Sequence, residues 1–320
     1  MRINKKLLML CAFGVGLLLF LASSEQLAGW QESWQGGWRG DGTPPYTIAE
    51  GTVKGGVYVE GGHGYSREDP YVEAFELPEG EVEYARVYIP IWNYDGGDSI
   101  RVFVNGEEIA ERQEPDYLSA WGLGLYCLEA GSFLHSGKNE VSVRSQNPGG
   151  GPYGITLAAV YRNESMPPVR FWINEGNYAL AYTNKKDSVS SSFKGTLPDR
   201  PASLQVLLAA GTKGETDFLY FDSELVGTDV GRSADGRYFD LYRTEVIPES
   251  RESTLRFERG DEGYLHPCVA VLVGGTESDS EPEFLEVHEQ RASEGNRIPV
   301  PVILVTLLAC LALLYRYGKR

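Results

Sequence analysis

Short apolar runs separated by turn residues are the feature that most constrains the fold of this chain. Between residues 51 and 275 the runs are rich in Val, Ile, Tyr, Phe and Leu, and clusters of Gly, Asn, Asp and Pro separate them. Runs such as Val82–Ile91 and Ser99–Val104 are alternating or continuous, as in β-strands. No segment combines a 3.6-residue period with helix caps. The pattern therefore predicts an all-β fold of the sandwich or barrel type.

The order of these runs is repeated along the chain. The run Val102–Glu107 returns as Leu219–Glu224, and the run Ile155–Tyr161 returns as Pro267–Val273. Matching elements in a constant order indicate an internal repeat.

We therefore predict two tandem jelly-roll-like β-sandwich domains, at residues 51–163 and residues 164–276. Two unrelated β-domains matched by chance are the alternative. Asn105-Gly106 in the first copy predicts a type I′ hairpin turn, because these residue types tolerate positive φ.

Asp95 and Asp98 lie in another turn-like segment and make a weak candidate calcium loop, since hard cations bind clustered oxygens. An ordinary Asp/Gly turn is the stronger interpretation. No other metal site is expected, so calcium is the one cofactor that the sequence leaves open.

The N-terminus reads as a secretory signal peptide over residues 1–24. Arg2, Lys5 and Lys6 precede the apolar run Leu7–Ala22, and small residues follow it. An uncleaved signal anchor is the alternative. Residues 25–50 form a leader rich in Trp and Gly.

The C-terminus predicts one transmembrane helix at residues 298–315, followed by a basic cytoplasmic tail at residues 316–320. A buried core helix is the alternative. The acidic stretch at residues 277–297 predicts an extended stalk. Together these segments predict a single-pass protein of the cell membrane with an extracellular ectodomain.

Charge and cysteine content exclude some partners. The chain has a formal net charge of −16, so nucleic acid is not an expected partner, because phosphate binding needs a basic face. Cys127 and Cys268 remain once the two terminal segments are set aside. They form either a disulfide or two buried free thiols.

Several strand and turn motifs resemble the domain of unknown function 3344, found in surface proteins of methanogenic archaea and some bacteria. The matching segments are Leu77-Pro78, Ala85–Tyr88, Val102–Gly106, Gly137–Val141 and Leu157–Tyr161. The match covers the first repeat well and the second loosely. These motifs are structural, so the resemblance implies a fold and a compartment and no activity.

A small number of residues suggest contact with a ligand or a modification. Trp30, Trp34 and Trp38 recur every four residues in the leader, and flat aromatic rings form sugar-binding platforms. Packing onto the first sandwich is the alternative. Asn163 begins an Asn-Glu-Ser glycosylation sequon. No catalytic constellation is recognisable.

Three functions stay open at this point. The first is a non-enzymatic, membrane-anchored surface protein with a structural or adhesive role in the cell envelope. The second is an extracellular carbohydrate-binding protein that uses the tryptophan platform. The third is an extracellular hydrolase with an unrecognised site. The expected partners are the membrane and either envelope glycans or surface proteins.

Overall fold

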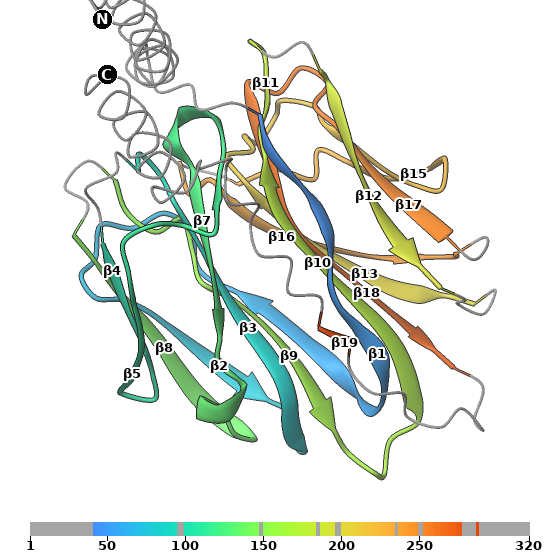
Figure 1. The fold of residues 1–320 in the computed structure, drawn as a ribbon. Coiled ribbons are helices and arrows are strands. Elements are labelled where there is room, and N and C mark those ends of the chain that lie inside the picture. Colours follow the sequence, from blue (N-terminus) through green and yellow to red (C-terminus); the bar gives the residue numbers. More distant parts are fainter. Residues whose placement is uncertain are drawn as a thin grey trace, which may run out of the picture. The chain divides into compact units, whose positions relative to one another are not determined.

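The computed structural model describes residues 41–94, 99–146, 150–183, 186–195, 200–233, 236–248, 252–276 and 286–287. These residues lie in one compact unit, residues 36–289. Strands dominate the described part of the chain, where the helical elements are the short 3₁₀ turns η1 (Ala120–Gly122) and η2 (Gly131–Phe133). The all-β prediction is confirmed (Figure 1).

The first half of the unit contributes two groups of strands. A four-stranded sheet has the order β2-β8-β4-β5. The sheet that faces it contains five strands of this half, in the order β1-β9-β3-β7-β6. The strands are β1 (Gly42–Gly61), β2 (Tyr71–Leu77), β3 (Glu81–Ile91), β4 (Ile100–Val104), β5 (Glu107–Arg112), β6 (Tyr117–Leu118), β7 (Gly124–Glu129), β8 (Gly137–Ser145) and β9 (Thr156–Arg162).

The second half contributes the same arrangement. Its four-stranded sheet has the order β12-β17-β14-β15, and the facing order is β10-β18-β13-β16. The strands are β10 (Pro168–Tyr178), β11 (Leu180–Ala181), β12 (Ser188–Lys194), β13 (Ala202–Ala209), β14 (Phe218–Phe221), β15 (Glu224–Thr228), β16 (Phe239–Val246), β17 (Glu252–Glu258) and β18 (Tyr264–Gly275).

Strands in equivalent places have the same neighbours in the two halves. The ladder β2-β8-β4-β5 corresponds to β12-β17-β14-β15, and β1-β9-β3-β7 corresponds to β10-β18-β13-β16. Both are paired antiparallel throughout. The matched runs of the sequence, such as Ile155–Tyr161 and Pro267–Val273, occupy equivalent strands, β9 and β18. In each half, two facing sheets share this order of eight strands in a β-sandwich, with β6 added beside β7 in the first half and β11 paired with β18 in the second.

Strand β1 is shared by both halves. Its first part pairs with β10, from Gly42 to Lys54, and its second part pairs with β9, from Gly55 to Gly61. The change of partner falls at Gly55, which has φ of +147°. A Cβ there would lie 2.0 Å from the carbonyl oxygen of Tyr161. Only glycine fits this bend, and through it the sheets of the two halves become one continuous sheet.

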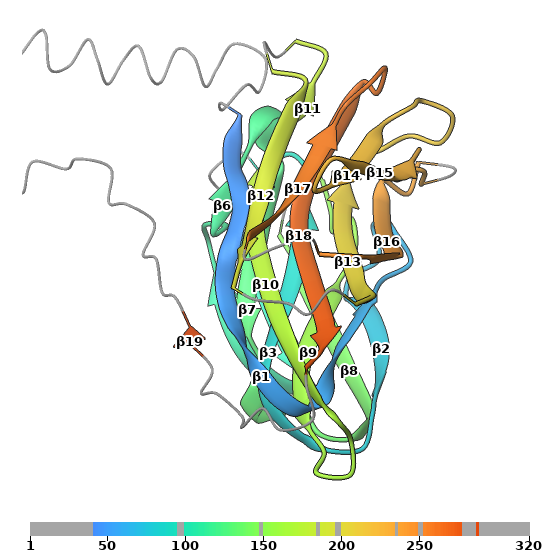
Figure 2. The ribbon, with the colours of Figure 1, turned by 90° about the vertical axis from the view of Figure 1, so that its right-hand side faces the viewer.

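The strands form successive layers (Figures 1 and 2). Three hydrophobic cores lie between these layers. Alternation along a strand sends neighbouring side chains to different cores. On β3, Tyr88 enters the central core while Val87 enters the core of the first sandwich. On β18, Val271 enters the central core and Leu272 the core of the second sandwich. Both faces of these strands are buried, which explains their continuous apolar runs.

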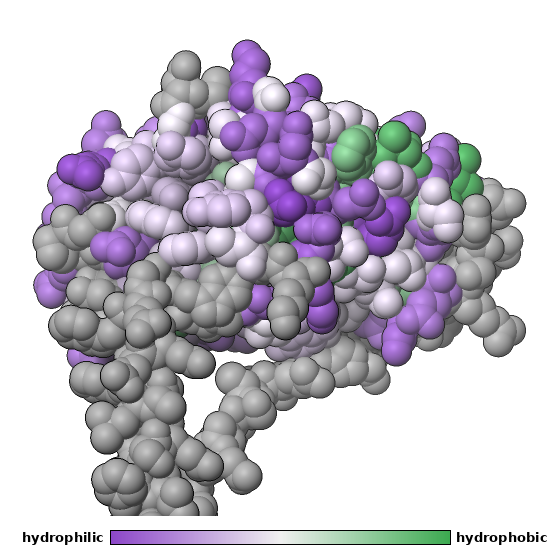
Figure 3. Space-filling view, turned by 90° about the horizontal axis from the view of Figure 1, so that it is seen from above, coloured by the Kyte–Doolittle hydropathy of each residue, from purple (hydrophilic) through white to green (hydrophobic). Residues whose placement is uncertain are grey.

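The ladders place eight connections at one end of the unit. The strands that finish there are β1, β3, β5, β8, β10, β13, β15 and β17, because each pairs antiparallel with its neighbours. We call this end the loop face. Viewed from it, the described surface is mostly hydrophilic or intermediate in hydropathy, with hydrophobic side chains gathered along one edge (Figure 3).

Some sequence predictions fall outside the described residues, and one boundary differs. The signal peptide, the transmembrane helix at 298–315 and most of the stalk lie outside the described residues, whereas β19 (Glu286–Val287), within the stalk, pairs with β1 at Ala49 and Glu50. No helix among the described residues is long and apolar enough to span a membrane. Strand β1 begins at Gly42, inside the segment assigned to the leader, because residues 46–49 continue its ladder with β10.

Candidate functional site

Unusual backbone conformations gather on the loop face. Of the residues that the structure describes, five non-glycine residues with positive φ lie in its connections: Asn93, Trp121, Ala210, Asp229 and Tyr238. The other three, Asn105, Asp222 and Ser223, belong to the tight hairpins of β4 with β5 and β14 with β15. Strained non-glycine residues outside tight turns concentrate at functional sites. The loop face is therefore where a binding site is expected.

A hollow of about 650 Å³ opens on this face, and we call it the basic pocket. Both halves of the chain line it: Gly62, His63, Lys213, Arg232, Ser233, Arg237, Phe239 and Asp240. Three of these side chains carry a permanent positive charge, whereas Asp240 contributes the one carboxylate of this set. The pocket is thus basic although the whole chain is strongly acidic.

Carboxylates hold the loops of the basic pocket through backbone N–H groups. Asp217 accepts hydrogen bonds from the amides of Val230 and Gly231, at 3.1 and 2.9 Å. Asp240 Oδ2 accepts one from the amide of Ser233 at 2.8 Å. Burial raises the pKa of Asp240 to about 6. These carboxylates fix the segment that carries Arg232, and they do so without pairing with its guanidinium.

Glu262 does the same for the loop that carries Lys213. Its side chain is fully buried, and its Oε1 accepts a hydrogen bond from the amide of Thr212 at 2.8 Å. Burial raises the pKa of Glu262 to about 9, and the neighbouring Glu215 adds to this shift. Glu262 is therefore a neutral acid at pH 7.

His63 is oriented by a carboxylate from β2. Its Nδ1 lies 2.6 Å from Glu73 Oε1, which also accepts hydrogen bonds from the His63 amide and from the Tyr71 hydroxyl. The imidazole stacks on the Tyr71 ring with centroids 4.6 Å apart. With Nδ1 engaged, Nε2 is the ring nitrogen left to meet a ligand in the pocket.

An aromatic cluster adjoins the basic pocket. Trp92 stacks on Tyr153 with centroids 6.3 Å apart, and Tyr65 and Tyr238 contact Tyr153 from other sides. Tyr238 is 39% exposed, so it forms the outer rim of the cluster. The ring of Phe239, which lines the pocket, packs where Gly61 and Gly154 leave room for it. The site therefore combines charged and flat apolar groups.

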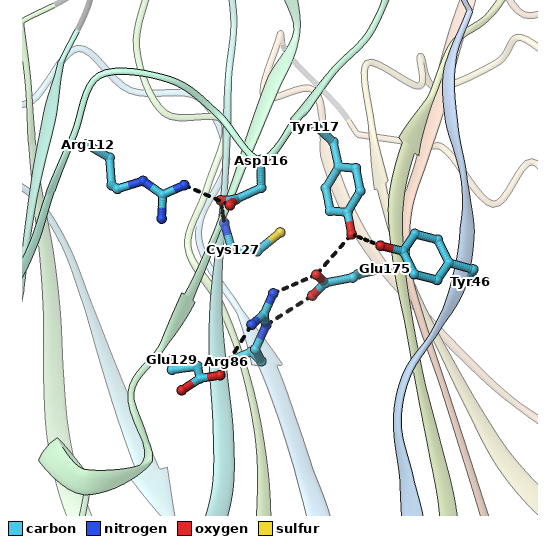
Figure 4. A network of polar contacts seen from close by, with 8 residues as sticks. All are labelled: Tyr46, Arg86, Arg112, Asp116, Tyr117, Cys127, Glu129 and Glu175. Carbon is cyan, nitrogen blue, oxygen red and sulfur yellow. Dashed lines mark hydrogen bonds and ion pairs between the residues drawn. The ribbon is translucent and has the colours of Figure 1, made fainter. Parts of the chain in front are cut away.

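A buried ion pair joins the two halves (Figure 4). Arg86 on β3 donates two hydrogen bonds to Glu175 on β10, at 3.0 and 2.6 Å. Tyr117 donates another to Glu175 at 3.1 Å and contacts the Tyr46 hydroxyl at 2.8 Å. The Glu175 side chain is only 3% exposed. This network crosses the central core, so its role is to fix the halves against each other.

Two of the predicted sites lie outside the described residues. They are the tryptophan platform of Trp30, Trp34 and Trp38 and the calcium loop of Asp95 and Asp98. Both stay predictions. Among the described residues no group of three or more His, Cys, Asp or Glu side chains could hold a metal ion.

Asn163, the predicted glycosylation site, is half-buried between β9 and β10. Its Nδ2 donates to the carbonyl oxygen of Glu79 at 3.0 Å, and its Oδ1 accepts from the Ser165 hydroxyl and amide. The nitrogen that would carry a glycan is thus engaged in this structure, and glycosylation stays a prediction.

Cys127 and Cys268 are both free and buried in the central core. Of the two alternatives left open by the sequence, the structure has the pair of buried thiols. The two residues share one core, because Cys127 on β7 and Cys268 on β18 both face the central core from the joined sheet. Burial raises the pKa of both thiols. They are therefore protonated and unreactive at neutral pH.

The basic pocket was missed by reasoning from the sequence. His63 lies 150 residues before Lys213, and no local motif connects them. Arg86 and Glu175 carried a weak signal, since each is a charged residue with apolar residues close by in its strand. A charge in such a place is usually paired when the strand is buried on both faces.

The fold and site together define an all-β protein of sandwich architecture with a basic pocket at its loop face. The chain belongs to the family described as a protein of unknown function, DUF3344, whose model matches residues 34–273. No curated protein sequence matches it.

Solved structures resemble the chain only distantly. A conserved protein of unknown function from Pseudomonas aeruginosa has 10% identity and a TM-score of 0.27, over 73% of this chain and 100% of that one. A lectin from Pleurotus ostreatus in complex with GalNAc has 13% identity and a TM-score of 0.21, over 78% and 86%. The β-glucuronidase 2 of Bacteroides uniformis has 15% identity and a TM-score of 0.22, over 61% and 25%. Likenesses of this size carry no functional argument.

Proposed function

We propose that this protein is a non-enzymatic binding protein of the cell exterior, built from two tandem jelly rolls, whose loop face binds a saccharide. One observation carries the proposal: the aromatic cluster around Tyr153 lies beside a hollow of about 650 Å³ on the face where strained backbone gathers. Pockets of this volume suit small organic ligands, and flat rings bind sugar faces at low entropic cost.

Placement outside the cell is part of the same proposal. It is supported by the predicted signal peptide at 1–24 and the predicted membrane span at 298–315. The acidic stretch at 277–297 would separate the sandwich unit from the membrane. A protein held in this way can bind envelope glycans or surface proteins. We therefore include a structural or adhesive role in the cell envelope in the proposal.

A glycan array probed with the full chain in neutral detergent tests the proposal. Tyr238→Asn removes the exposed ring, and Asn tolerates the positive φ of 54° at this position. We expect this variant to bind saccharides about tenfold more weakly than the wild type.

Ile247→Asn is the matched control, because Ile247 is 53% exposed and follows β16 at the opposite end of the unit. It should bind as the wild type does. An array that is silent with the wild type, or equal losses in the two variants, would overturn the proposal.

A further inference from the structure

We infer that the basic pocket takes the anionic group of an acidic saccharide, a carboxylate or sulfate borne on a sugar. The inference deepens the proposed function and rests on it for the sugar part of the ligand. Lys213, Arg232 and Arg237 supply the positive charge from two loops of the second half, and His63 faces them from the first half.

The three cations are uncommitted. None of them makes an ion pair with a described residue. Most of the described arginines do: Arg86, Arg101, Arg112, Arg162, Arg170, Arg243, Arg256 and Arg259. In a chain of net charge −16, carboxylates are abundant enough to neutralise every cation. Keeping three unpaired cations around one hollow repels other cations and attracts an anion.

The nearby carboxylates are occupied by other partners. Asp217 and Asp240 accept backbone amides, Glu262 accepts the Thr212 amide, and Glu73 binds His63 and Tyr71. Glu60 pairs with Arg243 at 2.7 Å. The loops are therefore held in place by acids that leave the guanidinium groups of Arg232 and Arg237 free for a ligand.

Arg237 is also positioned by the opposite half. The Tyr65 amide donates to the Arg237 carbonyl oxygen at 2.7 Å. A Cβ at Gly64 would lie 2.4 Å from Arg237 Cβ, so the glycine lets the two segments touch. These contacts fix the segment that carries Arg237, and a guanidinium can bind carboxylate or sulfate oxygens through two parallel hydrogen bonds.

The size and walls of the pocket point to an anion on an organic body. A hollow of about 650 Å³ exceeds the space that a free sulfate needs, and the Phe239 ring supplies an apolar wall. The aromatic cluster continues from that wall through Tyr238 and Tyr153. A sugar ring against these groups would place its charged substituent among the cations.

Three polymers with one backbone test the inference on the full chain in neutral detergent: dextran, carboxymethyl-dextran and dextran sulfate. Isothermal titration calorimetry gives the Kd for each. The test variant is Arg232→Gln/Arg237→Gln, and the matched control is Lys138→Gln/Arg200→Gln, which removes equal charge at residues that do not line the pocket. Inorganic sulfate serves as competitor.

We expect the wild type to prefer a charged dextran over dextran. Loss of the two guanidinium groups should raise the Kd for that polymer by about 10- to 100-fold, and the control should change it less than about twofold. Sulfate should compete only weakly.

Equal weakening in both variants, or no preference for the charged polymers, would overturn the inference. If neutral glycans still bound in a manner dependent on Tyr238, the proposed function would survive that result. If inorganic sulfate bound the pocket as tightly as the charged polymers do, the pocket would be a site for simple anions. The part of the inference that assigns it a saccharide would then be wrong.

Discussion

At the residue scale, buried carboxylic acids decide how the loops of the site are held. Glu262 is fully buried, and its Oε2 finds no hydrogen-bond partner that the structure shows. A carboxyl group in such a place is stable only when it is protonated. The folded state therefore keeps a proton that the unfolded chain has already lost at neutral pH.

The substitution Glu262→Gln tests this directly. The folded-state pKa of about 9 lies above the ordinary 4.5, so the wild type loses stability as pH rises from about 4.5 towards 9. The introduced amide stays neutral at every pH and can still accept from the Thr212 amide. We expect the variant to match the wild type at pH 4.5 in urea unfolding and to be more stable at pH 9. Identical pH profiles for the two proteins would contradict this account.

The Arg86–Glu175 pair is a second residue-scale feature with a structural role. Removing one partner of such a pair leaves an uncompensated buried charge, which costs about 3–5 kcal/mol. The pair crosses the central core, so this cost falls on the contact between the halves.

At the element scale, the bend in β1 depends on one glycine. Gly55→Ala forces a side chain to within 2.0 Å of the Tyr161 carbonyl oxygen at φ of +147°, so we expect a loss of about 2–5 kcal/mol in unfolding free energy. The control is Gly106→Ala, where φ is +83° and a Cβ meets nothing within 4 Å. That change should cost about 1 kcal/mol. Chemical denaturation measures both, and equal losses would show that the clash at Gly55 is relieved.

The elements also show what could be read from the sequence. The Asn105-Gly106 turn was predicted, and it has φ of 52° and 83°, as a type I′ turn requires. Apolar runs and turn residues are local signals, so the strands and their repeated order were accessible. The partner change of β1 was not, because it depends on a contact between Gly55 and Tyr161 over 100 residues away.

The site was less predictable than the fold for the same reason. His63, Lys213 and Arg237 each stand in ordinary polar loop sequence, and only the packing of the two halves brings them to one hollow. The tryptophans of the leader carried the clearest sequence signal for binding, and they lie outside the described residues.

At the scale of the whole molecule, the central core makes the two halves interdependent. Its strand members come from β1, β3, β7 and β9 in one half and from β10, β13, β16 and β18 in the other. Either half alone would expose this surface to water. We therefore expect the two sandwiches to unfold together, in one transition.

The two core cysteines report on this cooperativity. Cys127 lies in the first half and Cys268 in the second, and both are inaccessible in the folded state. In rising urea, a maleimide should label both at the same midpoint, with mass spectrometry assigning each site. Labelling of one cysteine well before the other would show that a half opens independently.

The place of β18 in the sheet has a mechanical consequence. Hydrogen bonds join it to β10 on one side and to β13 on the other. A force applied along β18 would therefore load both ladders in the strand direction. It would have to shear the two ladders together instead of peeling an edge strand bond by bond, so β18 resists extraction more strongly than an edge strand would.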